Sequence, residues 1–94
     1  MLRDVAYLVD ILEAAQLALS YTDANTEEEF YNNQQCQDAV VRRLEIIGEA
    51  ARRVSIEVRS AYPDLPWEEM IGLRNLLIHE YDDIDLSVVW QTVR

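Results

Sequence analysis

The stretch DAVVRRLEIIGEAARR, residues 38–53, predicts a long amphipathic helix in the middle of the chain. Its apolar residues alternate steps of four and three and continue into the next segment as Val40, Leu44, Ile47, Ala51, Val54 and Val58. This spacing places all six side chains on one face of an α-helix. The pattern predicts a single helix over about residues 33–60, which at ~1.5 Å per residue would span ~40 Å.

The apolar face of this helix is wider than one neighbouring helix can cover. Ala39, Ile46 and Ala50 widen it on one side, and Val41 and Gly48 widen it on the other. An apolar arc of about 220° exceeds what one adjacent helix covers, so we expect packing against more than one element, from the same chain or from a second subunit. The opposite face is expected to be solvated and to form local ion pairs; it carries Arg42, Glu45, Glu49, Arg52 and Arg53.

Composition sets the fold class. The chain has 94 residues, half of them hydrophobic, and contains only two Gly and two Pro. Few turns and many helix-forming residues predict an all-α fold, and the length suits one domain over residues 1–94. Together with the segments below, this composition predicts an antiparallel bundle of four to five helices.

Two helices are expected before residue 33. Residues 3–20 carry an amphipathic stripe at steps of three and four residues, formed by Val5, Leu8, Leu12, Ala15 and Leu19. Thr26 followed by Glu29 has the spacing of a capping box, which predicts a short helix starting there.

Two more helices are expected after residue 60. Pro63 and Pro66 prevent the central helix from continuing, and Pro66 is suited to open a new helix that runs to about residue 80. Asp85 can cap a last helix, in which one face is shared by Leu86, Val89, Trp90 and Val93.

Charge and cysteine content limit the possible functions. Eighteen acidic residues face eight basic ones, all arginine, and the net charge is -10. This balance argues against coating nucleic acid non-specifically but allows one focused phosphate site, because arginine binds phosphate with two parallel hydrogen bonds. Cys36 is the single cysteine, so no internal disulfide can form, and we expect a small buried side chain.

The sequence predicts a cytoplasmic protein without a membrane partner. No apolar run approaches the roughly 20 residues that cross a bilayer. The start, MLRDVAYLVD, is charged where a signal peptide would be apolar.

The segment RNLLIHEY, residues 74–81, is the strongest candidate for a functional site. In helical projection Arg74 falls in the centre of the apolar face of its helix, while Asn75 and His79 lie one turn apart on an adjoining face. An arginine in this position needs an anion or several carbonyl groups, because breaking a buried charge pair costs roughly 3–5 kcal/mol. An anion could come from the protein, as Asp82, Asp83 or a carboxylate of another helix, or from a ligand.

The residue types in this segment suit phosphodiester chemistry. A permanent cation, a carboxamide and an imidazole can bind a phosphate and move protons near neutral pH. A structural role, in which Arg74 forms an internal ion pair and His79 is a satisfied half-buried side chain, is the alternative. One histidine and scattered acids show no metal-ligand spacing, and no glycine-rich phosphate loop is present, so we expect no metal and no cofactor.

Several motifs resemble one family. The order R-N-x-x-x-H-x-Y is similar to the motif of HEPN domains, and the extended set YLVDILEA, DAVVRRLEIIGEAARR, PDLPWEEMIGLRNLLIHEY and VVWQTV resembles the HepT-type toxins over nearly the whole chain. The resemblance implies an endoribonuclease toxin that is paired with a minimal nucleotidyltransferase antitoxin. It further implies that Arg74 and His79 are catalytic, that Asn75 accompanies them, and that the antitoxin attaches AMP to Tyr81.

RNA cleavage by the 2′-hydroxyl predicts a dimer. The reaction needs a base, an acid and a group that stabilises the extra negative charge, and one histidine cannot fill both proton roles in one pass. A two-fold dimer would supply two copies of His79 and of Arg74. The alternative function is a non-catalytic, nucleotide-binding or adaptor subunit for a nucleotidyltransferase. Without the resemblance, Tyr81 would be expected only to complete the core.

Overall fold

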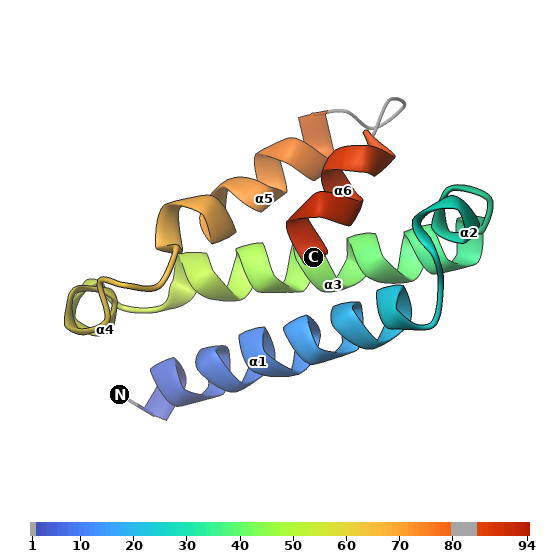
Figure 1. Ribbon diagram of the computed structural model, residues 1–94. Helices are drawn as coiled ribbons and strands as arrows, with labels where there is room; N and C mark the ends of the chain where they lie inside the picture. Colours follow the sequence, from blue (N-terminus) through green and yellow to red (C-terminus); the bar gives the residue numbers. More distant parts are fainter. Residues whose placement is uncertain (1, 80–84) are drawn as a thin grey trace.

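The computed structural model describes residues 2–79 and 85–94, with the side chains of residues 3–73 and 85–94. Within these ranges every regular element is an α-helix, which confirms the predicted fold class (Figure 1). The helices are α1 (Leu2–Asp23), α2 (Glu27–Tyr31), α3 (Gln34–Arg53), α4 (Ile56–Ala61), α5 (Trp67–His79) and α6 (Leu86–Val93). No helix in this part of the chain is long and apolar enough to cross a bilayer.

Helix α3 is the centre of the bundle. Figure 1 shows α1 along one side of α3 and α5 along the other, and α6 folds back toward the middle of the molecule. Helices α1 and α3 are antiparallel, because the N-terminal Asp4 of α1 contacts Ser55 just beyond the C-terminal end of α3. Contacts with α1, α2 and α5 all fall on α3, so the wide apolar arc is covered by several elements of the same chain.

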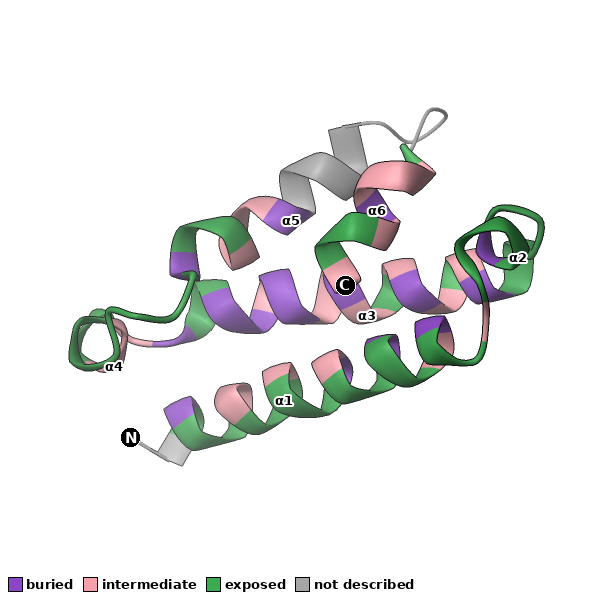
Figure 2. Ribbon diagram, viewed as in Figure 1, coloured by how far each residue is buried: buried purple, intermediate pink, exposed green. Residues whose placement is uncertain are grey.

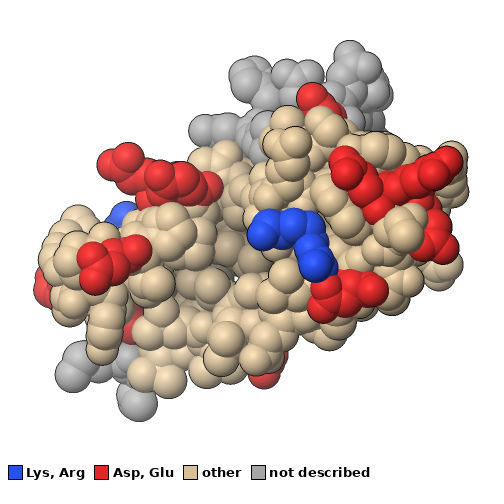
Figure 3. Space-filling model, viewed as in Figure 1, with Lys and Arg blue, Asp and Glu red and all other residues tan. Residues whose placement is uncertain are grey.

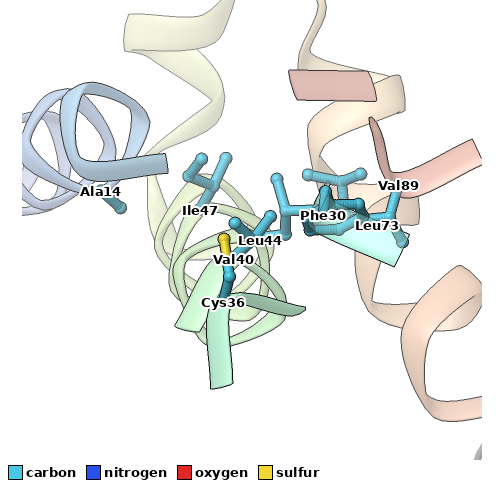
Figure 4. Close-up of a cluster of buried hydrophobic side chains, with 8 residues drawn as sticks. All are labelled: Ala14, Phe30, Cys36, Val40, Leu44, Ile47, Leu73 and Val89. Carbon is cyan, nitrogen blue, oxygen red and sulfur yellow. The ribbon is translucent and has the colours of Figure 1, made fainter. Parts of the chain in front are cut away.

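The core positions predicted for the central helix, residues 33–60, are confirmed. Val40, Leu44, Ile47, Ala51 and Val54 are all buried, and Val58 is partly buried. The larger of two core clusters draws on α1, α2, α3, α5 and α6 (Figure 4); its buried members are Ala14, Phe30, Cys36, Val40, Leu44, Ile47, Leu73 and Val89. Burial raises the pKa of the Cys36 thiol, in agreement with its predicted role as a small buried side chain.

The predicted end of the central helix was wrong. Helix α3 stops at Arg53 instead of near residue 60, and α4 starts at Ile56. Val54 adopts an extended conformation, and the Ser55 hydroxyl accepts a hydrogen bond from the Val58 amide at 3.3 Å. The Asp4 carboxylate accepts two hydrogen bonds from Ser55, from the amide at 2.8 Å and from the hydroxyl at 2.9 Å. Asp4, which lies 51 positions before Ser55 in the sequence, thus stabilises the break between α3 and α4.

The Asp4–Ser55 contact predicts a pH-dependent stability. Hydrogen bonds from the Ser55 amide and hydroxyl lower the pKa of the Asp4 carboxyl group. The stability that the Asp4 carboxylate adds to the folded state is therefore complete above its unfolded pKa of about 4, and it is lost as pH falls through the lower pKa of the folded state. Asp4→Asn is expected to lower the melting temperature at pH 7 by roughly 5 °C. The difference from wild type should shrink below about pH 4 in thermal unfolding followed by circular dichroism.

A matched control is available on the same helix. Asp10 is exposed, so Asp10→Asn should change the melting temperature little at either pH. Equal effects of the two substitutions, or a difference for Asp4→Asn that stays constant down to pH 3, would contradict the assigned role.

The packing face of α1 also differs from the prediction. Small or polar side chains face the core: Ala14, Ala18 and Thr22 are at most 2% exposed. From the predicted stripe, Val5, Leu12 and Leu19 are exposed, and only Leu8 and Ala15 are partly buried. Small side chains let two helices approach closely. Helix α3 therefore packs against the face of α1 that carries the alanines, and the face with larger aliphatic residues is left exposed.

The predicted helix caps are confirmed. Thr26 and Glu29 form a capping box at the start of α2, with Thr26 accepting from the Glu29 amide at 3.1 Å and the Glu29 carboxylate accepting from the Thr26 amide at 2.8 Å. Asp85 accepts from the Ser87 and Val88 amides at 3.0 and 3.3 Å and caps α6. Val89 is buried, as its place on the predicted apolar face of α6 requires.

Candidate functional site

The candidate site lies on a helix that is anchored at its start. Trp67, the first residue of α5, is buried, and its indole N–H donates to the Tyr62 carbonyl at 2.9 Å. Leu73 is also buried, while Met70 and Ile71 pack partly against the core. The first two turns of α5 are therefore fixed to the bundle before the candidate residues begin.

The backbone of three candidate residues belongs to α5. By helical register, position 74 falls on the face that carries Trp67, Met70 and Ile71, and positions 75 and 79 lie one turn apart on an adjoining face. The side chains of Arg74, Asn75 and His79 lie outside the described part of the structure, and so does the whole of Tyr81. The anion partner of Arg74 and the convergence of two subunits at this site therefore stay predictions.

Most of the other arginines whose side chains are described are already paired with carboxylates, in agreement with the predicted ion pairs on α3. The pairs are Arg42 with Glu45 at 3.6 Å, Arg52 and Arg53 with Glu49 at 2.7 and 3.2 Å, and Arg94 with Asp23. Figure 3 shows acidic side chains spread over one face, with basic groups far fewer. Because Arg74 is the single arginine of the α5 sequence, it is the cation that this helix can offer to a phosphate.

A groove with a volume of about 490 Å³ lies between α1 and α3, away from the candidate residues of α5. Its lining carries charges of both signs, from Asp10, Arg42, Glu45, Glu49 and Arg53. Glu49 already binds Arg53, so this groove has no evident preference for an anion or a cation. Among the described residues, no group of three His, Cys, Asp or Glu side chains could hold a metal ion.

The described side chains add supporting residues to the candidate site but no new reactive group. Trp67 positions the start of α5, and Pro66 before it was the sequence signal for that start. Asp4 and Ser55 fix the break between α3 and α4, and no sequence pattern could have linked two residues so far apart.

Fold and composition together define the class: a small helical domain with an arginine and a histidine five residues apart on one helix. Comparison with known families identifies it further. The family model described as "Ribonuclease HepT-like" matches residues 11–94, which include all of α5. The chain belongs to the HepT-like ribonuclease family.

Individual relatives agree with this assignment. "Putative RNase MJ1380" of Methanocaldococcus jannaschii is 47% identical over 93 residues, which cover 98% of this chain and 85% of that protein. "Probable ribonuclease HepT" of Thermococcus cleftensis is 41% identical over 88 residues, or 94% of this chain and 80% of the relative. "Gamma-glutamylcyclotransferase and putative RNase MJ0434" of M. jannaschii is 42% identical over 95 residues, which cover all of this chain but 43% of that longer protein. No solved structure matches the chain significantly.

Proposed function

We propose that this protein is a metal-independent endoribonuclease, acting as the toxin of a two-gene toxin–antitoxin module. The observation that carries the proposal is the family match over residues 11–94, which spans Arg74, Asn75 and His79. The ribonuclease names of several relatives support RNA as the substrate class. The proposed substrate also supports a place of action in the cytoplasm.

The proposed roles follow from the chemistry of RNA cleavage. The 2′-oxygen attacks phosphorus and forms a new P–O bond, while the bond from phosphorus to the 5′-oxygen breaks. His79 accepts the proton of the 2′-hydroxyl, and His79 of the partner subunit donates a proton to the leaving 5′-oxygen. Arg74 binds the phosphate and stabilises its added negative charge, and Asn75 supports this arrangement with its amide.

The surface charge favours a small site over a broad RNA interface. The net charge of -10 repels an RNA backbone, so binding depends on a few arginines brought together. A two-fold dimer that brings two α5 helices together would double the local positive charge. The proposed dimer therefore serves substrate binding as well as proton transfer.

The direct test is cleavage by the purified protein in excess EDTA. A labelled RNA should be cut at neutral pH to products with 2′,3′-cyclic phosphate ends, because the 2′-oxygen is the nucleophile. The same strand made with 2′-deoxyribose should remain intact, since it lacks that nucleophile. Loss of cleavage in EDTA that returns with a divalent metal would refute metal independence. Tight binding to a nucleotidyltransferase without any cleavage would favour the adaptor function instead.

Tyr81 is the proposed point of control. An antitoxin of the nucleotidyltransferase class would transfer AMP from ATP to the Tyr81 hydroxyl and release pyrophosphate. The added phosphate and base would lie two residues from His79, where they compete with RNA for Arg74. Modified protein is therefore expected to lose RNA cleavage.

Peptide mass spectrometry after incubation with antitoxin and ATP tests this step. The expected adduct is on the peptide that contains Tyr81 and is absent from Tyr81→Phe. Tyr62 is 59% exposed, so Tyr62→Phe is a matched control that should still be modified. An adduct confined to another residue would count against Tyr81 as the acceptor.

We also propose that residues 1–94 form one domain. The core clusters combine residues of every part of the described chain, from α1 to α6. The alignment to less than half of a longer M. jannaschii protein supports a unit of this size.

A further inference from the structure

Helix α4 and the linker that follows it leave apolar side chains uncovered. None of the six residues of α4 is buried, and Figure 2 shows α4 and the linker to α5 exposed over most of their length. Ile56 of α4 is 70% exposed, and Leu65 of the linker is 46% exposed. Exposed aliphatic side chains that line one hollow suggest a surface that another molecule covers.

These side chains line a groove between α4 and the start of α5, with a volume of about 450 Å³. Its apolar lining comes from Ile56, Pro63, Leu65 and Trp67, and we call it the α4 groove. Trp67 is the buried member of this set, so its side chain lies deepest in the groove. A volume of this size is within the usual range for binding sites, ~300–1,000 Å³.

Hydrogen bonds hold both walls of the α4 groove in place. Asp4 fixes the break before α4. The Arg59 Nε–H donates to the Val54 carbonyl at 3.1 Å, and the Trp67 indole N–H donates to the Tyr62 carbonyl at 2.9 Å. A groove that is already ordered loses little conformational entropy when a partner binds.

The surroundings of the groove are acidic. Glu68 and Glu69 belong to its lining, and Glu57 and Asp64 are exposed on α4 and the linker. Arg59 is the single basic residue of the same stretch of sequence. In the described part of the chain none of these four carboxylates forms an ion pair. Figure 3 shows acidic side chains gathered at this end of the molecule.

The acidic surroundings favour a basic partner for the α4 groove. The phosphates of a nucleic acid or of an anionic membrane would be repelled by the carboxylates around it. A second copy of the chain would set the same carboxylates against each other. A segment with apolar side chains flanked by lysine or arginine would instead fill the groove and pair with the carboxylates.

We propose that the α4 groove binds another protein through a basic amphipathic segment, whose cationic side chains pair with Glu68 and Glu69. The proposal goes beyond the proposed function, because this surface contains neither Arg74 nor His79 and does not depend on RNA cleavage. Trp67 lines the groove and also anchors α5, so the bound partner would contact the helix that carries the candidate site.

A fluorescein-labelled amphipathic peptide, with leucine on one helical face and lysine on the other, is the probe for this proposal. Fluorescence anisotropy should show that it binds the full chain. Leu65→Ser is expected to weaken binding roughly tenfold, because one buried aliphatic contact is lost. Glu68→Gln combined with Glu69→Gln is expected to weaken binding roughly fivefold at low salt and little at high salt.

Matched substitutions outside the groove control for general effects of charge and apolar surface. Val5→Ser removes an aliphatic side chain that is 58% exposed on α1. Glu27→Gln combined with Glu28→Gln removes two neighbouring charges from the first turn of α2, as the test variant does from the first turn of α5. Both control variants should bind the peptide as tightly as wild type.

Several outcomes would overturn the proposal. Failure of the peptide to bind wild type, or equal binding by wild type and Leu65→Ser, would show that the groove does not take such a segment. Equal losses in the test and control variants would mean that the peptide binds the acidic surface as a whole. Comparable binding of a peptide with glutamate in place of lysine would remove the argument from charge.

Sedimentation velocity distinguishes a basic partner from a second copy of the chain. Wild type and Leu65→Ser should have the same mass without peptide, and a lower mass for Leu65→Ser would mean that a second copy covers the groove instead. Circular dichroism would establish that the variants keep their helices. Ile56→Ser, at a position that is 70% exposed, replaces Leu65→Ser if that variant fails to fold.

Discussion

His79→Ala is expected to lower the rate of RNA cleavage by ~10²–10⁴-fold, the usual contribution of a general acid or base. Arg74→Ala is expected to cost a similar factor, because the phosphate loses its charged hydrogen-bond donor. Alanine favours helix at both positions, so circular dichroism spectra should match wild type. Initial cleavage rates in EDTA provide the measurement.

Mixed dimers separate a shared site from two independent sites. Wild-type and His79→Ala chains would be unfolded, mixed in equal amounts and refolded together. If each cut needs both copies of His79, activity should fall to roughly one quarter, the fraction of dimers with two intact subunits. Independent sites would retain about half of the activity.

Gln91→Ala is the control for this mixing experiment, since Gln91 is exposed on α6. A mixture of wild-type and Gln91→Ala chains should keep full activity. A half-active mixture would exclude the two-subunit site but leave His79 as a catalytic residue. Full activity of the pure His79→Ala protein would remove histidine from the mechanism altogether.

Phe30→Ala is expected to cost about 3–5 kcal/mol of unfolding free energy, a large part of the roughly 5–15 kcal/mol available to a domain. Phe30 is fully buried within the core cluster (Figure 4). The centroids of the Phe30 and Trp90 rings are 5.4 Å apart, so this contact joins α2 to α6. Removing the ring is expected to leave a cavity in the core cluster that Phe30 shares with Val40, Leu73 and Val89. Urea unfolding followed by circular dichroism should show a much lower midpoint.

The neighbouring Tyr31 supplies the control for Phe30. Its side chain is 37% exposed and donates its hydroxyl hydrogen bond to Glu27 at the surface of α2. Tyr31→Ala removes a ring of similar size from the same short helix and should cost less than about 1.5 kcal/mol. Equal losses for the two variants would mean that α2 contributes through its helical structure instead of through the buried ring.

Local sequence signals predicted the helix starts well. The capping box at Thr26, Pro66 before α5 and Asp85 before α6 each mark an observed start, because the groups that cap a helix lie within three residues of its end. The same locality explains the missed end of α3. The apolar pattern continues through Val58, whereas the carboxylate that stabilises the break comes from Asp4.

The candidate site also divides into features that local sequence predicts and features that depend on contacts elsewhere in the chain. Residue types and spacing along one helix pointed to Arg74, Asn75 and His79 as candidates, whereas their catalytic roles came from the family resemblance and stay predictions. Their helical backbone on α5 also followed from sequence. The anchoring of that helix by Trp67 did not, because the indole N–H bonds to a carbonyl in the preceding linker.

By itself, the sequence determined the all-α class, the family and most of the helices, since each depends on periodicity and on neighbours within a few residues. Only the tertiary structure decided which face of each helix is used. In α1 the periodicity favoured Val5, Leu12 and Leu19, but α3 packs against the alanine face and leaves those side chains exposed. A repeat along one helix marks an apolar face, whereas the face that packs against a neighbouring helix depends on how closely the two surfaces fit.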